Sequence, residues 1–262
     1  MASDSPNPSS QSRLSTRISL RWIPEPASET TDTIVMSVTG WFVDLRVDRK
    51  SGAIDWAIAG ERVVDSKEPR RVQFTHEIDS HNSFDAVDCG TFTTLPNSDD
   101  LETGSMPRPD LPGAPIAEYE EVWRELAFQP GPDDSRRGLS WVLESYHPET
   151  ADPGHIGEIH VQRIFLARIW GTYLALSQRQ TLLARGGAST VKEGGEVSAR
   201  REEWDSTTGW TVKYDLGPGS GSPNTTLPSM DDFGDITQSW QIGEVVGVRG
   251  GQYMVRAWEE VL

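Results

Sequence analysis

Apolar and polar residues alternate along much of the chain. Every second residue is apolar over residues 34–38 and again over residues 41–47, but the two runs are out of phase across Gly40. An alternation of period two is typical of a half-buried β-strand. A change of phase at a glycine indicates a β-bulge or a sharp bend, because one extra residue exchanges the two faces of the strand. We therefore expect a strand that bends at Gly40.

The second half of the chain repeats this arrangement. Apolar residues alternate over residues 165–169, a glycine interrupts them, and the alternation continues on the other parity at Leu174 and Leu176. At an offset of 131 residues, Val43 and Leu45 fall on these two leucines. The two copies therefore keep the same face inward.

Longer stretches of sequence repeat as well. Residues 93–101, TTLPNSDDL, return as TTLPSMDDF at residues 225–233, and residues 77–80 have a counterpart at residues 203–206. Two ordered copies with a spacing this long do not form a solenoid, and they indicate an internal duplication. The sequence therefore predicts two similar lobes in one chain.

The remaining segments complete an all-β prediction with one short helix. The helix is expected over residues 115–126, where Pro115 precedes apolar residues at helical spacing. Many short antiparallel strands with hairpin turns describe a barrel or a sandwich. Further strands are expected at residues 19–23, 54–59, 71–77, 139–145, 210–216 and 253–258. The predicted units are a disordered tail (1–14), an N-terminal β-barrel lobe (15–146), a linker (147–156) and a C-terminal β-barrel lobe (157–262).

Composition excludes several classes of partner. The chain has 24 Lys and Arg against 40 Asp and Glu, a net charge of −16, which opposes binding to nucleic acid or to an anionic membrane surface. No apolar run reaches the roughly 18 residues that a membrane span needs. Cys89 is the single cysteine, so no internal disulfide is expected. The N-terminus lacks the apolar segment of a secretory signal, so we expect a cytoplasmic location, and the small size of the chain also allows the nucleus.

The sequence carries no motif of a known catalytic or cofactor site. It lacks a nucleophile elbow, a phosphate-binding Gly-Lys-Ser/Thr loop and a dinucleotide fingerprint. His155 and His160 are five residues apart, which places them on opposite faces of a strand and prevents both from holding one ion. We therefore predict no catalytic residues, no cofactor and no metal.

The ten tryptophans are the feature of the chain that most suggests a ligand cavity. Small barrels can enclose one ligand, and aromatic walls suit an apolar pocket. The alternative, which we favour, is that these side chains fill the core. The candidate cavity residues are Trp41, Val43 and Leu45 in the first copy and Leu174, Leu176 and Trp210 in the second.

Several phrases of the sequence resemble the fungal Hri family. They are ISLRWI at residues 18–23, DWAIAGE at 55–61, EEVWREL at 120–126 and SWVLES at 140–145. The family is named for a physical interaction with a casein-kinase-like protein kinase of yeast. The resemblance implies two calycin-like barrels, similar in fold to lipocalins, joined in one chain. The family has no assigned catalytic residues, so none is transferred.

These observations lead to two hypotheses about function. The first is a non-catalytic intracellular interaction protein, whose partner is a casein-kinase-like protein kinase by resemblance. The alternative is a lipocalin-like binder, or an isomerase, of an apolar small molecule. A cavity at the candidate residues favours the alternative, and solid packing there favours the interaction protein.

Overall fold

Strands make up nearly all of the regular structure. The computed structural model describes residues 12–108, 110–132, 138–152, 154–218, 220, 227–234 and 239–261. The predicted disordered tail falls mostly on residues outside this set, and the first strand begins at Arg13. The helices of the described residues are two 3-10 turns, η1 (Pro148–Ala151) and η2 (Met230–Phe233), and neither is long and apolar enough to cross a bilayer.

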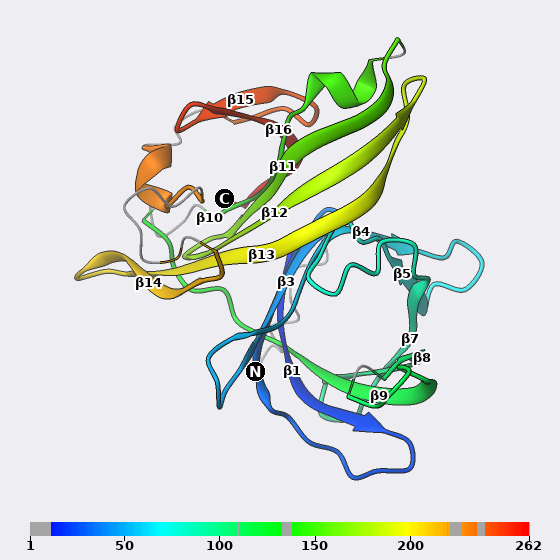
Figure 1. The fold of residues 1–262 in the computed structure, drawn as a ribbon. Helices are drawn as coiled ribbons and strands as arrows, with labels where there is room; N and C mark the ends of the chain where they lie inside the picture. Colours follow the sequence, from blue (N-terminus) through cyan, green and yellow to red (C-terminus); the bar gives the residue numbers. More distant parts are fainter. Residues whose placement is uncertain are drawn as a thin grey trace.

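The first nine strands form one antiparallel sheet, which appears in blue to green in the lower part of Figure 1. Its order is β3-β2-β1-β9-β8-β7-β5-β4-β6, and a further pairing of β3 with β4 closes it into an eight-stranded barrel. The strands are β1 (Arg13–Trp22), β2 (Thr31–Val38), β3 (Trp41–Asp48), β4 (Ile54–Val64), β5 (Arg71–Phe74), β6 (Ile78–Asp79), β7 (Asp88–Thr94), β8 (Asp100–Pro107) and β9 (Ile116–Glu125).

The other strands form a second antiparallel sheet, which lies above the barrel in Figure 1. It has seven strands in the order β14-β13-β12-β11-β10-β16-β15, and it curls into a half-barrel. The all-β prediction with two barrel lobes is therefore confirmed, with the second lobe open. The strands are β10 (Gly138–Ser145), β11 (Ile156–Ile169), β12 (Thr172–Arg185), β13 (Ser189–Asp205), β14 (Gly209–Leu216), β15 (Val245–Val248) and β16 (Gly251–Val261).

Strand β10 pairs with β11 and β16 in the second sheet. Our sequence-based division had included residues 139–145 in the N-terminal lobe. The pairing changes from one sheet to the other before Gly138, rather than at residues 147–156. The predicted linker itself contains η1 and reaches the start of β11.

The predicted bend at Gly40 is a tight hairpin turn between two strands. Thr39 and Gly40 have φ values of 45° and 92°, so this two-residue turn has the left-handed backbone that suits paired strands. The turn explains the change of phase, because it pairs even-numbered Met36 with odd-numbered Val43. The change of phase at Gly40 is real, but it marks a hairpin turn and not a β-bulge.

Gly171 occupies the equivalent turn between β11 and β12, after Trp170 with φ of 51°. At Gly171 close packing excludes a side chain, since an added Cβ would lie 2.3 Å from the carbonyl oxygen of Pro130. The expectation that both glycines occupy equivalent turns is confirmed. The reason differs between the copies: backbone conformation at Gly40 and close approach at Gly171.

The predicted helix over residues 115–126 is wrong, because this segment is strand β9. Strand β9 pairs with β1 on one side and with β8 on the other. Residues four apart share a face in a helix and also in a strand, so Tyr119 and Trp123 fit both periods. Two neighbouring strands decide between them, which local spacing cannot show.

The two sheets pack against each other through one hydrophobic core. The outer face of β2, β3 and β4 covers one face of β11, β12 and β13, and β3 lies beside these strands in Figure 1. The buried residues come from both sheets, so neither lobe has this core alone. We call this cluster the inter-sheet core; it includes Ile34, Met36, Val38, Val43, Leu45, Val47, Phe165, Ala167, Ile169, Leu174, Leu176 and Ala199.

Candidate functional site

Four of the six candidate cavity residues lie in the inter-sheet core. Val43, Leu45, Leu174 and Leu176 are at most 1% exposed there and pack among apolar side chains of both sheets. The register argument placed each pair on the inward face of its own lobe, whereas both pairs are buried in the core between the lobes. They face each other between the lobes, outside the barrel.

The two candidate tryptophans lie apart. Trp41 stacks on Phe165 with ring centroids 5.9 Å apart, and the guanidinium of Arg256 lies 4.9 Å from its ring. Trp210 belongs to a different cluster, on the opposite face of the second sheet. None of the six candidates lines the cavity described below.

That opposite face of the second sheet is covered by the chain itself. Leu227 and Met230 are buried on it, and Phe233 and Trp240 pack against the same cluster. The Tyr173 hydroxyl donates a hydrogen bond to the carbonyl oxygen of Pro228 at 2.8 Å. The second lobe is therefore filled by its own residues at this point.

The N-terminal barrel instead encloses a cavity of about 90 Å³. We call it the barrel cavity. Its wall combines aromatic rings with charged groups from every side of the barrel. The aromatic and apolar part is made by Val35, Phe42, Trp56, Ile58, Phe74, Phe92, Met106, Tyr119 and Trp123.

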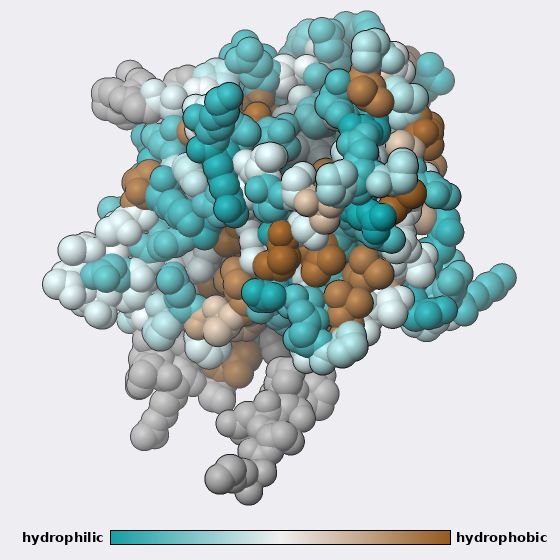
Figure 2. All heavy atoms as spheres, turned by 90° about the horizontal axis from the view of Figure 1, so that it is seen from below, coloured by the Kyte–Doolittle hydropathy of each residue, from teal (hydrophilic) through white to brown (hydrophobic). Residues whose placement is uncertain are grey.

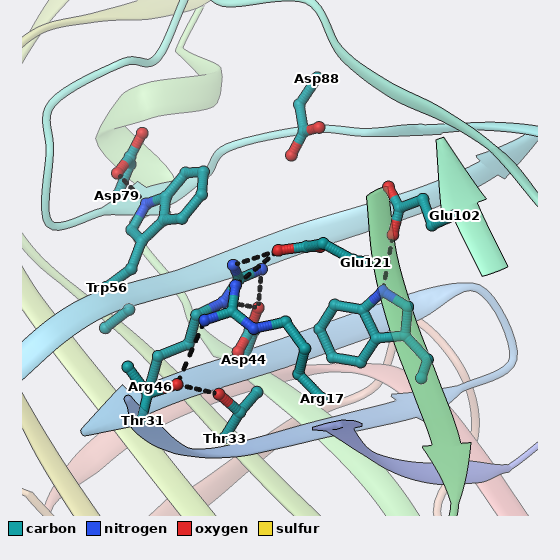
Figure 3. A network of polar contacts seen from close by, with 12 residues as sticks. Arg17, Thr31, Thr33, Asp44, Arg46, Trp56, Asp79, Asp88, Glu102 and Glu121 are labelled. Carbon is teal, nitrogen blue, oxygen red and sulfur yellow. Dashed lines mark hydrogen bonds and ion pairs between the residues drawn. The ribbon is translucent and has the colours of Figure 1, made fainter. Parts of the chain in front are cut away.

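Arg46 is the centre of the charged part of the wall (Figure 3). It is 7% exposed and donates to Asp44 Oδ2 at 2.8 and 3.0 Å and to Glu121 Oε1 at 3.4 Å. Its guanidinium carbon lies 4.7 Å from the ring centroid of Trp56 and 5.6 Å from that of Trp123. A buried cation is stable only when it is paired, and here two carboxylates and two indole rings surround it.

Arg17 closes the network from strand β1. It donates to Glu121 Oε1 at 2.5 Å, to Glu29 Oε2 at 2.7 Å and to the Thr31 hydroxyl at 3.2 Å. Glu121 therefore accepts hydrogen bonds from both buried arginines. Burial alone would lower the pKa of Arg17, but the neighbouring carboxylates raise it, so both arginines stay charged.

Asp44 is the least satisfied member of the network. Its Oδ2 accepts from Arg46, but its Oδ1 is buried and accepts no hydrogen bond. Burial raises the pKa of this carboxyl group, although Arg46 opposes the shift. A buried carboxylate oxygen without a donor costs stability. Among the described residues, Asp44 Oδ1 therefore remains an unsatisfied acceptor beneath the wall of the barrel cavity.

Glu102 is a second unusual carboxyl group in the wall. It accepts hydrogen bonds from the Tyr119 hydroxyl at 2.9 Å and from the Trp123 indole nitrogen at 2.8 Å. Burial, with the negative charges of Glu121 and Asp88, raises the pKa of Glu102 to about 8. It is mostly neutral at pH 7.

His76 lies behind the wall of the barrel cavity, between two carboxylates. Its Nδ1 lies 2.9 Å from Asp79 Oδ2, and its Nε2 lies 3.1 Å from Asp88 Oδ2. Burial alone would lower the pKa of His76, but the two carboxylates raise it to about 9. Asp79 also accepts from the Trp56 indole at 2.9 Å, so this unit fixes one of the rings beside Arg46.

These polar groups hold one another, which is an arrangement for positioning and binding. Among the described residues, no group of three or more His, Cys, Asp or Glu side chains is placed to hold a metal ion. Neither His155 nor His160 lines the barrel cavity.

Sequence reasoning missed the barrel cavity because its residues look like a solvent-facing side. On β3, Asp44 and Arg46 alternate with buried Val43 and Leu45, a pattern usually assigned to one dry and one wet face. A usable signal was present in β9, where Tyr119, Glu121 and Trp123 put aromatic and charged residues on the same face. Rings beside charges on one face indicate an enclosed polar site.

The fold and site define a small closed β-barrel, joined to a curled sheet, with room for one small ligand. The chain belongs to the family described as Protein HRI1, whose model matches residues 13–256. A solved structure with a similar fold is that of the uncharacterized protein YLR301w from Saccharomyces cerevisiae. The two share 14% identity with a TM-score of 0.63, over 95% of this chain and 99% of that one. No curated protein matches the chain.

Proposed function

We propose that this protein is a non-catalytic binding protein and that the barrel cavity is its ligand site. The observation that supports this most is a cavity of about 90 Å³ inside the closed barrel, lined by Asp44, a buried carboxylate with one unpartnered oxygen. Barrels of eight strands are just wide enough to be filled by side chains or to hold one small ligand. This barrel keeps a space, while the second lobe is filled.

The cavity wall narrows the ligand. A volume of about 90 Å³ is well below the roughly 300–1,000 Å³ of pockets for drug-sized molecules. A large, wholly apolar ligand would also leave Asp44, Arg46 and Glu121 facing apolar surface. The ligand should therefore be small and carry a polar group. This argues against the apolar ligand and the isomerase of our sequence-based alternative.

A cavity-filling variant tests the proposal. Val35→Phe adds a ring inside the barrel, whereas Val212→Phe makes the same change at a position that is 51% exposed on strand β14. We would screen both variants and the parent by ligand-observed NMR against small charged and neutral compounds. Binding to the parent and to Val212→Phe, lost in Val35→Phe, is the expected result. Equal binding to all three, or none to the parent, would contradict the proposal.

A protein partner is the second candidate function, and we propose a casein-kinase-like protein kinase by family resemblance, inside the cell. Membership in the HRI1 family over residues 13–256 and the net charge of −16 favour it, because an acidic surface suits a basic partner groove. Figure 2 shows hydrophobic side chains grouped on the face seen from below, among hydrophilic ones. Titration with a purified kinase at two salt concentrations tests this. Saturable binding that weakens with salt is expected, and no binding at low salt would refute it.

A further inference from the structure

The barrel cavity has an excess of negative charge. Three arginines line it, Arg13, Arg46 and Arg62. Arg17 and His76 behind the wall pair with Glu121 and Asp88, but each is shared with a further carboxylate, Glu29 or Asp79. Even with Glu102 neutral, carboxylates therefore outnumber the positive groups, so the interior favours a cation over an anion. The carboxyl groups that line it are Asp44, Asp88, Asp100, Glu102, Glu121 and Glu125.

The arginines of the wall do not satisfy this excess. Arg46 is shared between Asp44 and Glu121, and Arg13 is shared between Asp100 and Glu125 at 3.1 and 3.6 Å. After these pairings, Asp44 Oδ1 still accepts no hydrogen bond. This oxygen lies beneath the wall, where its charge is poorly screened by water and favours a cation in the cavity beside it.

The aromatic rings of the wall suit a cation as well. Trp56 and Trp123 already hold the guanidinium of Arg46, which shows that this interior accommodates a positive charge against ring faces. Phe42, Phe74 and Phe92 form a second group, with ring centroids 5.3 and 6.4 Å apart. Within the described chain no arginine or lysine lies over these phenylalanines, so they can receive a ligand.

We infer that the barrel cavity binds a small organic cation, an amine with a short apolar group. Its ammonium group pairs with the carboxylates of the wall around Asp44, and its apolar group packs on Phe42, Phe74 and Phe92. This inference rests on the proposed function and adds the ligand class to it. The competing feature is Arg62, the one lining arginine without an ion pair among the described residues, which could attract a carboxylate at the mouth.

Three probes of similar shape but different charge test whether the cavity prefers a cation or an anion. We would titrate the full chain with n-butylammonium, n-butanol and butyrate, and follow binding by NMR. Hydrogen bonds to charged groups contribute enough to expect n-butylammonium to bind about 10- to 100-fold more tightly than n-butanol, with butyrate weakest. Contacts from the butyl protons to the rings of Phe42 and Phe92 should place the probe in the barrel.

A matched pair of variants locates the effect. Asp44→Asn removes the charge in the cavity. Asp99→Asn makes the same change at another buried aspartate, which pairs with Arg124 Nε and Nη2 outside the cavity. The preference for n-butylammonium over n-butanol should disappear in Asp44→Asn and persist in Asp99→Asn.

The outcomes separate the two proposals. If n-butanol or butyrate binds the parent more tightly than n-butylammonium does, and Val35→Phe loses that binding, the inference of a cation is overturned and the barrel remains the ligand site. Binding of none of the three probes, together with a negative fragment screen, overturns both. The comparison in the parent chain stands even when Asp44→Asn does not fold.

Discussion

The inter-sheet core implies that the two lobes are stable only together, and Leu176→Ala tests this. Leu176 is wholly buried on β12, with Val43 and Leu45 of the barrel in the same cluster. Truncating a buried leucine costs about 2–5 kcal/mol, depending on how far the site can collapse. Rigid strands from two sheets surround this site, so we expect the upper half of that range. That is a large part of the roughly 5–15 kcal/mol by which a protein is usually stable.

Hydrogen exchange with mass spectrometry measures the effect separately in each sheet. Leu176→Ala should lower the protection of the slowest amides in β3 and in β12 by the same free energy, because both sheets lose the core at once. The matched variant is Leu182→Ala on the same strand, whose small cluster contains only residues of the second sheet. Because the two lobes unfold together, it should lower the protection of β3 as well, although it removes no contact with the barrel, and unchanged protection of β3 would show that the lobes unfold separately. A loss confined to β12 in Leu176→Ala would show that the barrel folds without the second sheet.

Three further variants test other parts of the structure. Gly171→Ala places a Cβ 2.3 Å from a backbone carbonyl oxygen and should cost about 1–3 kcal/mol in chemical denaturation; equal midpoints would show that the loop yields freely. Glu102 has a folded pKa raised from 4.5 to about 8, so the folded state holds the extra proton and stability should fall as pH rises through that window; in Glu102→Gln this fall should be missing, and an unchanged pH profile would contradict the shift. Trp41→Ala should cost about 3 kcal/mol through lost packing on the inter-sheet core, of which the stack on Phe165 is one part, without altering binding in the barrel cavity. Loss of the probe signal in a folded variant would contradict our placement of the site.

The fold was largely accessible from the sequence because strand alternation is a local property. The phase change at Gly40 and its copy at Gly171 marked real hairpin turns, and the shared register of Val43 with Leu174 marked one buried surface. What alternation cannot show is which side of a closed sheet is the apolar one. The register identified a dry face, and only the packing of one sheet on the other shows that this face lies outside the barrel.

The candidate site was hidden for a related reason. Asp44 and Arg46 face the barrel interior only because the sheet closes into a ring. That ring depends on the pairing of β1 with β9, two strands about a hundred residues apart in the chain, so no short window of sequence contains it. Strand β9 was misassigned for the same reason, since its partners β1 and β8 determine its conformation.

The barrel has its main apolar core on the outer face of three strands and mixes charged groups with aromatic rings inside, which separates stability from binding. Most small barrels fill their interior with apolar side chains and depend on that core. Here the outer face of β2, β3 and β4 provides the core together with the second sheet, so the interior does not need to be filled. An interior that carries little of the hydrophobic core can keep a cavity and an unsatisfied carboxylate oxygen, both of which reduce stability. Places where a natural sequence departs from the rules of packing are expected at functional sites. Among the described residues, Asp44 is one such departure, and it lines the barrel cavity.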